Sequence, residues 1–156
     1  MKKLALLLIL AVTIIGCSLG DDDGSSNIGY ELAVINDIEV PEYFEVNETY
    51  EIDVTFTLPS ACHKQLTPRS LDVRKGGSGP EERSNIYIGA VTSYNTSQDV
   101  CVEEDSSVVL ERTESFSLNI TENEEYTFYL WVGQNTAGEP EWRTVSVPVG
   151  APEESN

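Results

Sequence analysis

The sequence predicts an all-β protein built as a single antiparallel β-sandwich of about seven strands. Three observations support this prediction. Apolar and polar residues alternate with a period of two from residue 29 onward, turn-forming residues separate the short runs, and no stretch has the spacing of an amphipathic helix. About seven short strands in one domain of this length are typical of a sandwich.

The stretch ETYEIDVTFTL is the clearest strand. Its apolar residues alternate with acidic residues and threonines, and successive side chains of a strand point to opposite faces of a sheet. Proline, glycine and asparagine residues mark the turns between this strand and the others. The expected strands are residues 30–38, 50–58, 70–75, 85–94, 108–120, 126–132 and 142–149.

Residues 1–16 have the parts of a secretory signal peptide. Lys2 and Lys3 precede an apolar run over residues 4–15, which small residues follow. A helix of twelve residues reaches roughly 18 Å, whereas the hydrocarbon core of a bilayer is roughly 30 Å thick. The run is therefore too short for a stable membrane span.

The end of that run, Ile14-Ile15-Gly16-Cys17, resembles the lipobox of bacterial lipoproteins. The resemblance implies a diacylglycerol on the Cys17 thiol, cleavage before Cys17, and acylation of the new amino group, with palmitate among the expected chains. Several acyl chains, each contributing about 0.8 kcal/mol per buried CH₂, hold a soluble domain on a membrane without a spanning helix. Cys17 is thus the expected membrane anchor.

Residues 17–28 are expected to form a flexible tether, because they are short, polar and acidic. Asp21, Asp22 and Asp23 resemble the export signal of surface lipoproteins in one large Gram-negative phylum, although the known signals usually lie one or two positions nearer the cysteine. The resemblance implies an outer membrane lipoprotein exposed on the cell surface. A lipoprotein that faces the periplasm is the alternative.

The remaining cysteines, Cys62 and Cys101, are an even pair in an exported domain, and we expect one disulfide between them. It would close a loop of about 40 residues, worth roughly 4 kcal/mol in the chain-entropy model. A metal site is the alternative, but His63 is the only histidine and adjacent ligands rarely reach one tetrahedral ion. We expect no metal and no cofactor.

No residues form a convincing catalytic arrangement. Ser78 lies between two glycines, but Pro80 replaces the last glycine of a nucleophile elbow. His63 can serve as a general base, yet one histidine in a loop is more often incidental. We therefore expect a protein that is not an enzyme. The formal net charge of −18 argues against nucleic-acid binding, because phosphates are repelled.

Tyr126 opens the sixth expected strand in ENEEYTFYLWVG, where a tyrosine corner places its hydroxyl against the upstream backbone. Phe128 takes the core position that a cysteine holds in antibody domains. These residues favour an immunoglobulin-like sandwich over residues 29–150, followed by a flexible tail at 151–156. VPEYFEVNETYEIDVTFTLPSAC and YTFYLWVGQNTAG also resemble small uncharacterised immunoglobulin-like lipoproteins of the same phylum, a resemblance that implies no activity.

Tyr129, Trp131 and Trp142 are the candidate binding residues. If Tyr126 and Phe128 face the core, Tyr129 and Trp131 lie on the opposite face of the same strand. Pairing with the last strand would add Trp142 to that surface. Contiguous exposed aromatic rings often mark binding sites. The alternatives are that a loop or the N-terminal segment covers Trp131, or that the strand is shifted in register.

The expected function is that of a lipid-anchored module of the cell envelope, non-enzymatic, which binds a protein or a glycan or serves as an accessory to another component. One alternative is an exported protease inhibitor acting through the loops at residues 67–85 and 94–105. Another is a purely structural envelope lipoprotein. The expected partners are the membrane, through the lipid, and an envelope protein or glycan.

Overall fold

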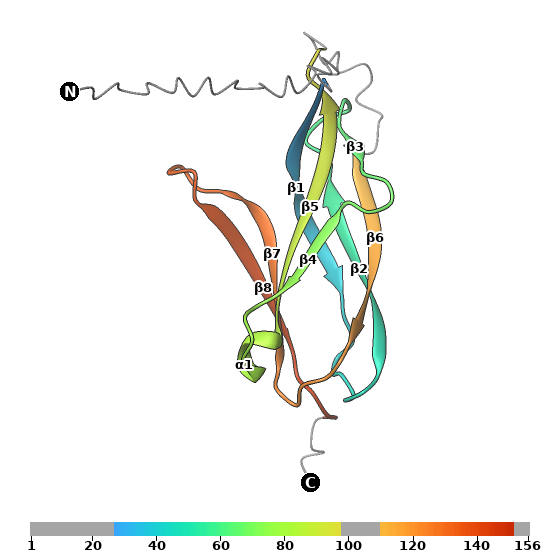
Figure 1. Ribbon diagram of the computed structural model, residues 1–156, viewed down its shortest axis with the longest axis vertical. Coiled ribbons are helices and arrows are strands. Elements are labelled where there is room, and N and C mark those ends of the chain that lie inside the picture. Colours follow the sequence, from blue (N-terminus) through green and yellow to red (C-terminus); the bar gives the residue numbers. More distant parts are fainter. Residues whose placement is uncertain (1–26, 98–109, 152–156) are drawn as a thin grey trace, which may run out of the picture.

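The computed structural model describes residues 27–97 and 110–151. These residues form a nearly all-β, sandwich-like fold, as the alternating sequence predicts (Figure 1). The elements are β1 (Ile28–Glu39), β2 (Thr49–Thr57), β3 (Lys64–Gln65), β4 (Leu71–Lys75), α1 (Pro80–Arg83), β5 (Asn85–Asn95), β6 (Glu111–Asn119), β7 (Tyr126–Gln134) and β8 (Pro140–Val147).

The first strand, β1, joins the two halves of the sheet. Its first half pairs with β5, ending with Ala33 opposite Ala90, and its second half pairs with β2, beginning with Val34 opposite Thr57. The resulting strand order is β6-β2-β1-β5-β7-β8, and β3 and β4 pair with the other edge of β5. Figure 1 shows β6 and β2 on one side of the molecule and β7 and β8 on the other.

One core lies between the two halves and collects the apolar side of every long strand. In β2 the side chains of Ile52, Val54 and Phe56 are fully buried, while the alternate residues are partly or fully exposed. The same alternation buries Ile86, Ile88 and Ala90 in β5, and Tyr126, Phe128 and Leu130 in β7. A period of two is the pattern of a sheet with one face in a core.

The expectation of a wholly antiparallel sandwich is wrong at one pairing. Strand β7 runs parallel to β5, with Tyr87 opposite Tyr129 and Ile88 opposite Leu130. From β6, at one edge of the sheet, the chain passes to β7, which lies beside β5. Strand β7 runs in the same direction as β5. Alternation of polar and apolar residues reports which face is buried but not the direction of a neighbouring strand.

Two small elements were not expected from the sequence. Strand β3 has only two residues, both exposed, and so it leaves no alternating pattern. Helix α1 has a single turn, too short for a helical period. The Glu82 carboxylate accepts a hydrogen bond from the Gly79 backbone N–H at 3.1 Å, which stabilises the start of this turn.

Tyr126 is fully buried at the start of β7, and its hydroxyl lies against the upstream backbone. The hydroxyl oxygen accepts hydrogen bonds from the backbone N–H of Thr121 at 3.0 Å and of Glu122 at 3.3 Å. This is the geometry expected of a tyrosine corner. Phe128 is also fully buried. The finer assignment to an immunoglobulin-like architecture stays a prediction.

Helix α1 is tied to the turn before β7 by an ion pair. Arg83 Nε donates to Glu122 Oε1 at 2.8 Å, and Arg83 Nη2 donates to Oε2 at 3.2 Å. The hydrogen bond from Arg83 holds the pKa of the Glu122 carboxyl below its usual value. A carboxyl whose pKa is lowered by folding stabilises the protein above its unfolded pKa, and this contribution disappears as the pH falls through the folded pKa.

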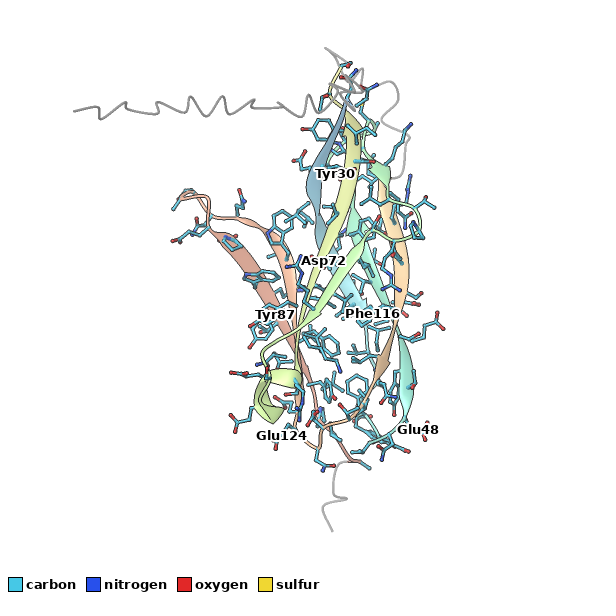
Figure 2. The ribbon with its side chains drawn as sticks, viewed as in Figure 1. Tyr30, Glu48, Asp72, Tyr87, Phe116 and Glu124 are labelled. Atoms are coloured by element: carbon cyan, nitrogen blue, oxygen red, sulfur yellow. The ribbon has the colours of Figure 1, made fainter. Side chains whose placement is uncertain are left out.

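We therefore expect Glu122→Gln to be less stable than the wild type at pH 7. The difference should shrink as the pH falls below about 4.3, the ordinary value for a glutamate. Urea unfolding of both proteins at a series of pH values measures this. The exposed Glu124, labelled in Figure 2, lies outside the ion pair, and Glu124→Gln is the matched control. A stability difference that stays constant at acid pH would contradict the assignment.

Candidate functional site

Three of the residues that the sequence singles out lie on one outer surface. In β7 the side chains of Tyr129 and Trp131 alternate with buried residues and point away from the core. Strand β8 pairs with β7 in an antiparallel register that sets Trp142 directly opposite Trp131. Trp142 is 41% exposed, and Trp131 is partly buried.

A fourth aromatic residue, Tyr87 of β5, joins this surface. The parallel pairing sets it opposite Tyr129, and the two rings stack with centroids 4.6 Å apart and planes 12° apart. The Trp142 ring meets Tyr87 edge-on at 5.7 Å. Tyr87, Tyr129, Trp131 and Trp142 are called the aromatic face below. Sequence analysis missed Tyr87 because β5 and β7 are not consecutive strands.

A groove of about 470 Å³ adjoins the aromatic face, between Trp131 and Trp142 on one side and the β1, β4 and β5 surface on the other. Strand β7 pairs with β5 only as far as Leu130, opposite Ile88. From Ala90 onward the same edge of β5 pairs with β1 instead, and the groove lies beside this change of partner. Figure 1 shows the rest of the β7–β8 hairpin leaving the sheet.

A bulge marks the point where the hairpin departs. The register of β7 and β8 shifts between Trp131 and Gly133. Gly133 has a φ of 141°, which side-chain-bearing residues rarely adopt. A bulge bends the strand that carries it and increases its local twist. The bend therefore falls next to the point where β7 stops pairing with β5.

Gly89 lines the groove from the middle of β5. A methyl group added there would meet only the Leu32 side chain, at 3.5 Å, which is an ordinary van der Waals distance. Its φ lies outside the left-handed range, so this position does not need glycine for its backbone. The missing side chain leaves room above β5, between Tyr87 and Leu32.

The polar side of the groove is formed by Asp72, labelled in Figure 2, and Arg74, both on β4. Arg74 Nε donates to Asp72 Oδ1 at 3.0 Å, and Nη2 contacts Oδ2 at 2.6 Å, so the two planar groups are held side by side. This hydrogen bond and the charge of Asp72 raise the pKa of the Arg74 guanidinium. Both side chains remain accessible from solvent.

His63, the candidate general base, contacts the first half of β1 at Glu31, the neighbour of the groove-lining Leu32. Its Nε2 is 3.0 Å from Glu31 Oε2, and its Nδ1 is 2.8 Å from Ser60 Oγ. A serine, a histidine and a carboxylate thus form one chain of hydrogen bonds. The Ser60 hydroxyl also accepts the Cys62 backbone N–H at 3.2 Å, as in a serine turn. This chain fastens the β2–β3 turn to β1.

Cys62 lies in that turn, close to Tyr94 and Asn95 at the end of β5. Cys101 follows shortly after this end of β5 but lies outside the described residues, so the pairing of Cys62 with Cys101 stays a prediction. Cys17 and the tether residues Asp21, Asp22 and Asp23 also lie outside them.

Within residues 27–97 and 110–151, no three histidine, cysteine or acidic side chains are grouped to hold a metal ion. The same part of the chain contains no helix with the length and apolar character needed to cross a membrane. Comparisons with protein-family models, with curated proteins and with solved structures find no match to this chain.

Proposed function

We propose that the protein is a lipid-anchored binding module of the cell envelope, and that the aromatic face with its groove is its binding surface. The observation that carries the proposal is the gathering of Tyr87, Tyr129, Trp131 and Trp142 from three strands beside one hollow. Trp142 and Tyr87 are 41% and 36% exposed. Exposed aromatic clusters of this kind mark interaction sites on soluble proteins.

The aromatic face also lies on the side of β7 that is turned away from the core. The core side of β7 and β8 is formed by Tyr126, Phe128, Leu130 and Val147, and Tyr129, Trp131 and Trp142 lie on the opposite side of the same strands. Keeping large aromatic rings at a solvent-accessible hollow favours a role in recognition.

The anchor is assigned to Cys17, with the acidic tether at Asp21 to Asp23 leading to the start of β1 at Ile28. The proposed location is the outer membrane, with the domain on the cell surface. No catalytic step is assigned, and the serine–histidine–glutamate chain is interpreted as a link between the β2–β3 turn and β1.

The proposal predicts that the aromatic face is covered in the native envelope. Hydroxyl-radical footprinting compares the protein in membranes isolated from cells that produce it with the same protein purified in detergent. Trp142 and Tyr87 should be oxidised several-fold less in the membranes. Tyr30 of β1, which is 65% exposed and outside the groove, is the internal reference. Equal oxidation of Trp142 and Tyr87 in both samples, relative to Tyr30, would contradict the proposal.

A further inference from the structure

We infer that the ligand of the groove is a ring of a neutral carbohydrate chain, an inference that rests on the function proposed above. The groove has a volume of about 470 Å³ and is lined by flat aromatic rings on one side and by a pair of planar polar groups on the other. Sugar rings present the same two characters, C–H groups on their faces and hydroxyls around their edges.

The aromatic side supplies a surface for the face of a ring. Trp131 and Trp142 lie opposite each other on β7 and β8 and both line the groove. The edge-on contact with Tyr87 holds the Trp142 ring in a fixed orientation. A flat, amphipathic side chain held in place loses little conformational freedom when a ligand packs on it.

The polar side supplies hydrogen bonds without a net charge. The Asp72 carboxylate accepts hydrogen bonds and the Arg74 guanidinium donates them, and the ion pair fixes both in one arrangement. Neighbouring hydroxyls of a sugar each donate and accept. The amide of Gln134, across the groove, can do both as well.

Charge argues against an ionic ligand. The chain carries a formal net charge of −18, which repels anionic sugars and nucleic acids. A cationic ligand needs an available carboxylate, but Asp72 is paired with Arg74, and Glu31, in the adjoining hollow, is hydrogen-bonded to His63. The groove also lies within the usual range for small-molecule sites, about 300–1,000 Å³. A protein partner would cover a far larger area.

Affinity electrophoresis of the full chain in detergent tests the inference. The gels contain β-1,3-glucan, hydroxyethylcellulose, mannan or starch as neutral probes, and polygalacturonate as the anionic probe. The variants are Trp142→Ala, which removes an aromatic surface, and Gly89→Leu, which fills the groove from β5 without entering the core. Tyr30→Ala removes an exposed aromatic ring elsewhere and is the matched control.

At least one neutral polysaccharide should retard the wild type and the Tyr30→Ala control equally. Binding by Trp142→Ala and by Gly89→Leu should be weaker by about tenfold or more. Gly89→Leu keeps the test decisive if Trp142→Ala proves unstable. Retardation by polygalacturonate alone, by no probe, or equally in all variants would overturn the inference. In those cases, protection of Trp142 from oxidation in native membranes would still support the proposed binding function. If Trp142 were not protected either, both the carbohydrate inference and the proposed function would be contradicted.

Discussion

Replacing Phe44 with alanine is expected to destabilise the protein by about 3–5 kcal/mol, the usual cost of deleting a buried aromatic ring. Phe44 belongs to no strand, yet it is fully buried. Its ring centroid lies 4.8 Å from that of Tyr50, 5.6 Å from that of Tyr126 and 6.2 Å from that of Phe128. One side chain therefore connects the segment after β1 with β2 and β7.

The backbone of Phe44 keeps its own partners in this variant, so the loss is assigned to the ring. Its N–H donates to the Pro148 carbonyl at 2.9 Å, and its carbonyl accepts the Gly150 N–H at 2.8 Å. Urea unfolding measures the change. Tyr43→Ala, at the partly buried neighbouring position, should cost clearly less. Equal losses in the two variants would show that Phe44 is not central to the core.

Replacing Glu114 with alanine is expected to cost about 1–3 kcal/mol, because it leaves buried backbone donors without an acceptor. The Glu114 carboxylate, on β6, accepts the Ser70 N–H with both oxygens, at 2.9 and 3.1 Å. It also accepts the Leu71 N–H at 3.4 Å and the Gln65 amide at 3.0 Å. Ser70 is only 2% exposed. This carboxylate links β6 to β3 and β4 across the two halves of the sheet.

Amide hydrogen exchange separates this role from a general loss of stability. In Glu114→Ala the Ser70 and Leu71 amides should exchange faster than the amides paired within the β2–β6 ladder. Glu114→Gln retains one oxygen acceptor and should show a smaller effect. Glu111→Ala, at the exposed start of the same strand, is the control. Unchanged exchange at Ser70 in Glu114→Ala would contradict the proposed link.

Strand positions were predictable because nearly every long strand has one side in the core. The expected strand at residues 50–58 corresponds to β2 at Thr49–Thr57, and that at residues 85–94 to β5 at Asn85–Asn95. The burial of Phe44 was not predictable, because a residue in a turn segment has no periodic neighbours that indicate which way it points. The parallel pairing of β5 and β7 was hidden for a related reason: strand direction depends on the path of the connecting segments.

Half of the candidate site was also predictable from the sequence, because side-chain alternation along a strand shows which residues share a face. Trp131 and Trp142 belong to consecutive strands joined by a short turn, so their shared surface follows from side-chain alternation. Tyr87, Asp72 and Gly89 come from β4 and β5, and only the tertiary pairing brings them to that surface. The groove itself depends on where β7 stops pairing with β5, and no local pattern of residues encodes such a point.

The same point on β7 separates the part of the strand that packs in the core from the part that borders the groove. Up to Leu130 the strand contributes to the core, and from Trp131 onward the hairpin borders the groove and ends in a turn closed by Asn135 and Glu139. Mutations beyond this boundary are expected to alter the proposed ligand surface while leaving the buried contacts of β7 intact. Under the proposed function, evolution can diversify specificity through the outer hairpin, by substitution or by lengthening the turn, on an unchanged scaffold.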